Sequence, residues 1–131
     1  MTARSWRNIA EHEAAHAVVA AHFGMRVTRV VASGPGNGYT QYEQTGDADQ
    51  CAAVRAAGDT WGRKLGSVPY IDLACADLAR FERDHGLARL WQAERAALDI
   101  LTARRDAVAA LADRIERERT VTFAYTPERA R

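Results

Sequence analysis

The sequence predicts a mainly α-helical α+β domain in which a small β-hairpin or sheet follows the first helix. Three observations predict this class: alanine-rich stretches that favour helix, one short β-branched run, and a glycine-rich turn directly after that run. The chain of 131 residues fits one domain that can bury a core of its own. The expected order is helix, strand, strand, helix, helix and a long last helix.

The first half of the chain carries the two predicted strands. Ser5 is a suitable N-cap for a helix that runs to about Phe23 and ends at Gly24. The segment Val27–Val31 alternates and is β-branched, which indicates a strand. Residues 34–38 form a turn signal, and residues 39–42 are expected as a second strand.

Three helices are predicted in the second half. The first covers roughly Asp49 to Leu65, and Pro69 suits the first turn of the next, which Gly86 would end. The last helix is expected over about Ala88 to Glu118, because large apolar residues mark one of its faces and arginines mark the others. Residues 1–119 are thus the predicted domain, and 120–131 a short, poorly ordered C-terminal tail.

Charge and composition exclude several classes of protein. A net charge of +1 argues against general affinity for nucleic acid. No signal peptide is recognisable and no apolar run would cross a bilayer, so we expect a cytoplasmic protein that binds neither nucleic acid nor membrane. Cys51 and Cys75 have no CxxC spacing, and reduced thiols are expected rather than a disulfide.

The pattern His12-Glu13-Ala14-Ala15-His16 is the strongest functional signal. His12 and His16 are four residues apart on the predicted first helix, so both imidazoles leave the same face and can meet at one ion. Glu13 would flank that ion and could take a proton from water that attacks a carbonyl. This spacing predicts a zinc peptidase site, with Zn²⁺ as the cofactor.

Two histidines on one helix can also be ordinary surface residues. Here, however, the surrounding helix is rich in alanine and valine, and the whole chain has 4 histidines. Polar groups in an apolar helix need partners, and a metal ion would serve His12, His16 and Glu13 together.

The residues alone leave the third zinc ligand open. A catalytic site needs three protein ligands and a fourth place for water. Asp72 is followed by small residues that would let its helix approach the first one, but the helix dipole also favours a first-turn aspartate. His85 suits the end of a helix, and His22 is expected at the surface because of its offset from His16. The candidates are Asp72, Cys75, Asp77, His85, His22 and the acids of the loop.

Several segments resemble, in order, the peptidase domain of the FtsH-type ATP-dependent zinc metalloproteases. The segment Ile9–Ala20, which contains the histidine motif, resembles the start of that domain. Val27–Val31 and Gly38–Thr40 resemble two of its strands, Ile71–Arg80 resembles its Asp-Leu segment, and the long helix with Thr120–Thr122 resembles its end. The family usually has glycine in place of Ala15, and an acidic residue where the nearest match places Gly62.

The resemblance implies a zincin-like fold in residues 1–119 and Asp72 as the third zinc ligand, beside His12 and His16, with Glu13 as general base. Because the chain carries no ATPase module, it resembles a stand-alone relative. We therefore expect it to cleave flexible or unfolded polypeptide, by itself or beside a separate ATPase that unfolds proteins.

The strand Val27–Ser33 is expected to bind an extended peptide by β-augmentation, which requires an open edge. Tyr39 is expected to pack within the sheet rather than to line a cleft. Two alternatives stay open: a non-catalytic zinc-binding or interaction module that keeps the fold, and a small HExxH protease that cleaves one regulator. Oligomeric state and substrate do not follow from the sequence.

Overall fold

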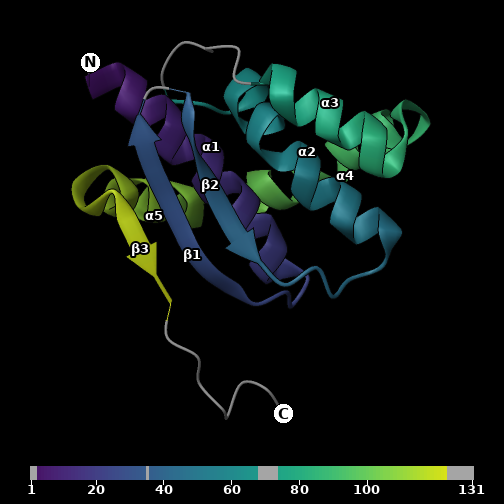
Figure 1. Ribbon diagram of the computed structural model, residues 1–131, viewed down its shortest axis with the longest axis horizontal. Coiled ribbons are helices and arrows are strands. Elements are labelled where there is room, and N and C mark those ends of the chain that lie inside the picture. Colours follow the sequence, from purple (N-terminus) through teal and green to yellow (C-terminus); the bar gives the residue numbers. More distant parts are fainter. Residues whose placement is uncertain (1–2, 35, 68–73, 124–131) are drawn as a thin grey trace.

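The computed structural model describes residues 3–34, 36–67 and 74–123, and it confirms the predicted α+β class (Figure 1). A three-stranded antiparallel sheet lies on one side of α1, and α4 and α5 lie on the other. The elements are α1 (Ala3–His22), β1 (Val27–Gly34), β2 (Asn37–Tyr42), α2 (Ala48–Lys64), α3 (Ala74–His85), the 3-10 turn η1 (Leu87–Arg89), α4 (Leu90–Ala103), α5 (Arg105–Glu118) and β3 (Thr120–Thr122).

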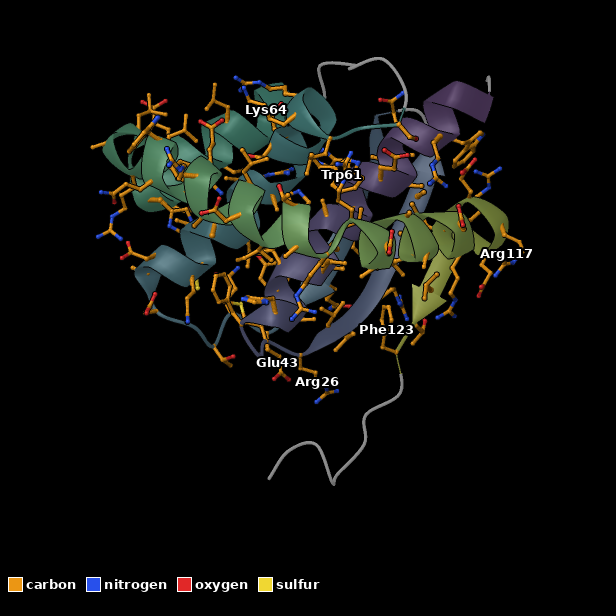
Figure 2. The ribbon with its side chains drawn as sticks, turned by 180° about the vertical axis from the view of Figure 1, so that it is seen from behind. Arg26, Glu43, Trp61, Lys64, Arg117 and Phe123 are labelled. Carbon is orange, nitrogen blue, oxygen red and sulfur yellow. The ribbon has the colours of Figure 1, made fainter. Side chains whose placement is uncertain are left out.

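Helix α1 is the centre of the core. It contacts β1, β2, α2, α4 and α5, and seen from behind it runs between the sheet and the α4–α5 pair (Figure 2). A helix surrounded by other elements must be apolar on most sides. The buried hydrophobic residues of α1 are mostly small, which allows its neighbours to pack close: Ile9, Ala10, Ala14, Ala15, Ala17, Val19 and Ala20.

The predicted hairpin is confirmed, and a third strand completes the sheet in the order β2-β1-β3. Val30 of β1 faces Thr40 of β2 and Val121 of β3. Val30, Ala32 and Val121 are buried, as expected for alternate residues that face a core. β1 therefore has a partner strand on each side, and the expectation that its edge is open to a peptide is wrong.

Helix α2 begins with a capping box. Asp47 accepts a hydrogen bond from the Gln50 backbone N–H at 2.8 Å, and the Gln50 side chain accepts one from the Asp47 N–H at 3.1 Å. The helix passes through Gly58 and Gly62, two residues that weaken an isolated helix. Its packing against α1 and α4 compensates for this.

The long helix predicted over 88–118 is two helices, α4 and α5, with Arg104 between them. At the junction the Arg104 N–H is shared by the carbonyls of Ile100 and Leu101, and its side chain donates to His22 Nδ1 at 3.0 Å. The break redirects the chain, because α4 packs mainly on α2 whereas α5 packs on α1.

Helix α3 ends at His85, and Gly86 follows with φ of 81°, which confirms the predicted helix stop. Its predicted start at Pro69 lies outside the described residues. Phe81 of α3 is buried in a second, smaller cluster with Ala52, Ala56 and Ala93. No helix in the described part of the chain is both long and apolar enough to cross a bilayer.

Candidate metal centre

The two motif histidines meet inside the protein, as their spacing predicts. His12 and His16 are 7% and 8% exposed, in a helix whose other buried residues are mostly hydrophobic. Their Nε2 atoms lie 3.2 Å apart, and the two rings are nearly perpendicular, at 81°. Two ring nitrogens thus face one point from successive turns of α1.

The distance between these nitrogens fits a metal ion. In a tetrahedral site with Zn–N bonds of about 2.0–2.1 Å, two ligating nitrogens are about 3.3–3.4 Å apart. The observed 3.2 Å is close to that value. Without an ion, the same distance permits one N–H···N hydrogen bond, which satisfies the pair with a single proton.

The backbone of α2 orients His16. His16 Nδ1 lies 2.7 Å from the Val54 carbonyl oxygen, which can only accept, so Nδ1 carries a proton and donates it. In a neutral imidazole the lone pair is then on Nε2, the atom that faces His12. Histidine ligands of metals usually donate their other N–H in this way.

Gly58, one turn after Val54 on α2, leaves the space for both rings. A Cβ at this position would lie 2.5 Å from His12 Cε1, 2.6 Å from His16 Nε2 and 2.7 Å from His12 Nδ1. Any side chain here would displace the imidazoles. The resemblance places Gly62 where the family usually has an acidic residue near the metal ligands. The residue of α2 that lies against the two rings is Gly58.

Glu13 is 4% exposed and is oriented by the sheet. The Thr40 hydroxyl of β2 lies 2.8 Å from Glu13 Oε1 and 3.0 Å from the Glu13 carbonyl oxygen. Because the Thr40 hydroxyl has a single proton, it donates at any moment either to Glu13 Oε1 or to the Glu13 carbonyl oxygen. Gly38 of β2 also lies beside Glu13: a Cβ at Gly38 would lie 2.5 Å from the Val31 carbonyl oxygen and 3.3 Å from Glu13 Cγ, and the close approach to the β1 backbone is what requires glycine.

The predicted third ligand, Asp72, lies outside the described residues, as do the side chains of Cys75 and Asp77. His22 is exposed, as expected, and accepts a hydrogen bond from Arg104. His85 ends α3 beside Phe81, where partial burial and the nearby Arg55 lower its pKa. Within residues 3–34, 36–67 and 78–123, no group of three His, Cys, Asp or Glu side chains is close enough to share an ion.

Sequence reasoning missed the groups that support the site. The Val54 carbonyl is main chain and has no side-chain signature, and Thr40 contacts Glu13 from a different element. The run Ala56-Ala57-Gly58 was the one usable signal for close packing of α2. Tyr39 was expected to pack within the sheet, but it is 48% exposed.

No protein-family model matches the chain. No curated protein is similar enough to count as a match either. The likeness to the FtsH-type peptidase domain therefore stays a prediction from the motifs themselves.

Proposed function

We propose that the protein is a stand-alone zinc peptidase in which His12, His16 and Asp72 hold Zn²⁺ and Glu13 is the general base. The observation that carries the proposal is the buried pair of Nε2 atoms 3.2 Å apart, with His16 held in the tautomer that directs its lone pair to that point. The motif spacing and the likeness to FtsH-type peptidases support the same assignment.

When bound, Zn²⁺ would polarise the scissile carbonyl and lower the pKa of its water to about 7. Glu13 takes a proton from the attacking water and returns it to the leaving amine. Thr40 holds one oxygen of the Glu13 carboxylate, which leaves the other to accept that proton. Both imidazoles are buried, which limits the access of bulk water to the point that their Nε2 atoms face.

The substrate is polypeptide in an extended conformation. Since β1 is covered on both sides, the edge that we assign to the peptide is the outer edge of β2, the strand that holds Glu13 through Thr40. Such a domain cleaves flexible segments in the cytoplasm, or works beside a separate unfoldase that delivers them.

The test measures zinc content and cleavage of a disordered, labelled polypeptide. His16→Ala and Asp72→Ala should lose zinc and activity together. Glu13→Gln should keep zinc and lose at least about 99% of the activity, since a general base contributes roughly 10²–10⁴-fold. His22→Ala is the matched control, because it removes an exposed histidine from the same helix.

Three results would overturn the assignment or a part of it. A wild-type protein without zinc would refute the metal centre. Tight zinc without any cleavage would refute the peptidase and support the non-catalytic zinc-binding module instead. Zinc retained by Asp72→Ala at full affinity would remove Asp72 from the ligand set.

A further inference from the structure

Strand β2 is a sheet edge without the usual protection against pairing. Within the described part of the chain only β1 pairs with it, and no strand lies along its other side (Figure 1). Proteins commonly block such an edge with charged residues or proline, because it pairs readily with another chain. The sequence of β2, Asn37–Tyr42, contains neither. The edge is therefore suited to an extended polypeptide.

The hydrogen-bond pattern of the sheet shows which residues of β2 face this open edge. The Ala32 N–H of β1 donates at 2.8 Å to the backbone beside β3. Because backbone groups alternate between the two sides of a strand, Val31 bonds in the other direction, to its partner Tyr39 on β2. The neighbours of Tyr39 in β2, Gly38 and Thr40, therefore direct their N–H and C=O groups to the open edge.

The two faces of β2 have different surroundings. The Thr40 hydroxyl lies 2.8 Å from Glu13 Oε1, and a Cβ at Gly38 would lie 3.3 Å from Glu13 Cγ, so both residues face α1. Side chains alternate along a strand, so Tyr39 points to the opposite, outer face of the sheet. No described helix covers that face, and Tyr39 is 48% exposed (Figures 1 and 2). A large aromatic ring is thus presented beside the open edge, one residue from Thr40.

We propose that Tyr39 is a specificity-determining residue, whose ring takes an apolar side chain of the extended substrate. This inference rests on the proposed function, which assigns the substrate to the outer edge of β2. A substrate residue that exchanges backbone bonds with Thr40 has its own side chain on the α1 face, the face of Glu13. In an antiparallel pairing, the next substrate residue lies directly opposite Tyr39 on the outer face, in the kind of pair that brings side chains closest.

The neighbours of Tyr39 favour an apolar partner. Val31 of β1 lies directly opposite Tyr39 on its other side, so the two form an apolar pair on the outer face. A substrate side chain would extend this row by one strand. Aromatic and β-branched side chains form the favourable cross-strand pairs with an aromatic ring. We therefore expect phenylalanine, tyrosine, isoleucine or valine to be preferred at one fixed position relative to the scissile bond.

The first experiment profiles cleavage sites in a library of short peptides of random sequence, read by mass spectrometry. Wild type and Tyr39→Phe should enrich aromatic and β-branched residues at one position relative to the cut, and Tyr39→Ala should lose that enrichment. Thr120→Ala is the matched control, because Thr120 lies opposite Val31 on the far edge strand of the sheet. It should keep the wild-type preference.

The second experiment separates binding from catalysis. The best-cleaved peptide and its counterpart with alanine at the selected position carry fluorescein, and fluorescence anisotropy measures their binding to zinc-loaded Glu13→Gln protein. Alanine in the peptide should weaken binding roughly two- to fivefold, as should Tyr39→Ala in the protein. The two changes together should weaken it no more than either alone. In the active enzyme, Tyr39→Ala should raise KM and leave kcat and zinc content unchanged.

The inference is overturned if wild type cleaves the library but Tyr39→Ala keeps the same preference, or if Thr120→Ala loses it equally. It is also overturned if the protein dimerises in sedimentation and Tyr39→Ala disrupts the dimer without changing cleavage, because a second copy then occupies the edge. These outcomes leave the proposed function intact. A wild-type protein that cleaves no peptide refutes the proposed function, and the inference with it.

Discussion

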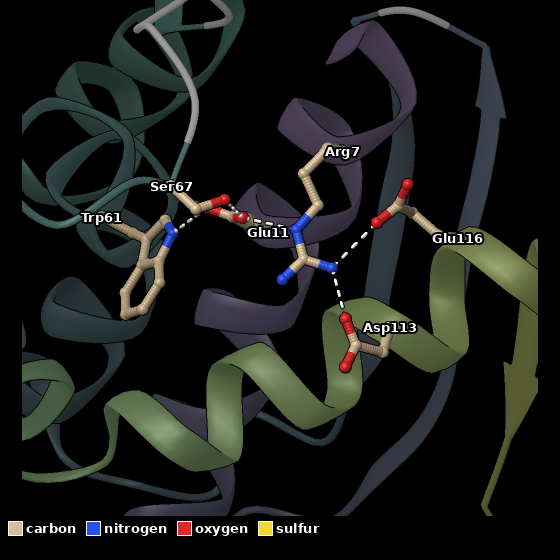
Figure 3. Close-up of polar contacts among 6 residues, drawn as sticks. All are labelled: Arg7, Glu11, Trp61, Ser67, Asp113 and Glu116. Carbon is tan, nitrogen blue, oxygen red and sulfur yellow. Dashed lines mark hydrogen bonds and ion pairs between the residues drawn. The ribbon is translucent and has the colours of Figure 1, made fainter. Parts of the chain in front are cut away.

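Adjacent residues of α1 carry two buried polar clusters that are satisfied in opposite ways. Glu11 receives four hydrogen bonds from protein donors, so its charge is neutralised within the fold (Figure 3). The donors belong to Arg7, Trp61 and Ser67. His12 and His16 instead direct two ring nitrogens at each other across 3.2 Å. One proton can satisfy that pair, but a cation satisfies both lone pairs at once. Glu11 is thus a polar group whose partners lie within the fold, whereas the histidine pair has the geometry of two ligands to one ion.

The largest expected effect is at Gly58, where any side chain reaches both imidazoles. Gly58→Ala would place a Cβ within 2.5–2.7 Å of three ring atoms, so the rings must move apart. We expect zinc affinity to fall roughly 100-fold, by analogy with lost ligand orientation. Overpacking should lower stability by about 1–3 kcal/mol, offset in part by the higher helix propensity of alanine.

Zinc competition and urea unfolding measure the two effects of Gly58→Ala. Gly62→Ala, one turn further along α2, is the matched control and should change zinc affinity little. Equal zinc affinity in Gly58→Ala and wild type would mean that the close packing of Gly58 against the two rings does not control metal binding.

The Glu11 cluster should respond to acid, whereas the histidine pair should respond to metal. The pKa of Glu11 is lower in the folded protein than its ordinary value of 4.5. Its contribution to stability is therefore complete above that value and is lost as the pH falls toward the folded-state pKa. At neutral pH, Glu11→Gln should destabilise the protein by about 1–3 kcal/mol, since a charged acceptor of several buried donors is lost.

Urea unfolding of wild type and Glu11→Gln at about pH 7 and about pH 3 checks the sign. The difference between the two proteins should shrink in acid, because the stabilisation from an ionised Glu11 is lost as the pH falls below its ordinary value of 4.5. A difference that is constant with pH would show that the carboxylate is not charged in the folded state. Carboxyl groups that do not share Arg7 with Glu11 titrate alike in both proteins, so their contributions cancel.

The smallest expected effect is at Thr40, which contacts Glu13 and neither imidazole in the described contacts. Thr40→Val removes the hydroxyl and leaves the Glu13 carboxylate less well oriented. We expect kcat to fall roughly tenfold, which is about 1.4 kcal/mol, with unchanged zinc content. Thr28→Val, in the neighbouring strand, removes a hydroxyl that binds the Gln41 carbonyl and serves as the control. Equal loss of activity in both variants would point to a general effect on the sheet.

The sequence predicted those features that depend on local patterns. The spacing of His12 and His16 fixed their common face, the alternation of Val27–Val31 marked β1, and Gly86 marked the end of α3. Arg104 and β3 were missed because tertiary packing decides them: no local signal interrupts the helical pattern at Arg104, and three residues are too few to indicate a strand.

The supporting groups of the site were missed for a related reason. Gly58 supports the site by having no side chain where the imidazoles lie, and Val54 supports it through its backbone carbonyl. Both roles depend on where α2 crosses α1. Asp72 was assigned from a resemblance, and it stays a prediction because it lies outside the described residues.

The arrangement of the sheet has a consequence for folding order. β1 pairs with β2 across a short turn, but its other neighbour, β3, comes from the far end of the described chain. During synthesis the valine-rich segment Val27–Val31 therefore keeps one side unpaired until all the helices have been made. An unpaired apolar strand edge is a known starting point for wrong association. The second side of β1 is therefore paired only after β3, the last element of the described chain, has been made.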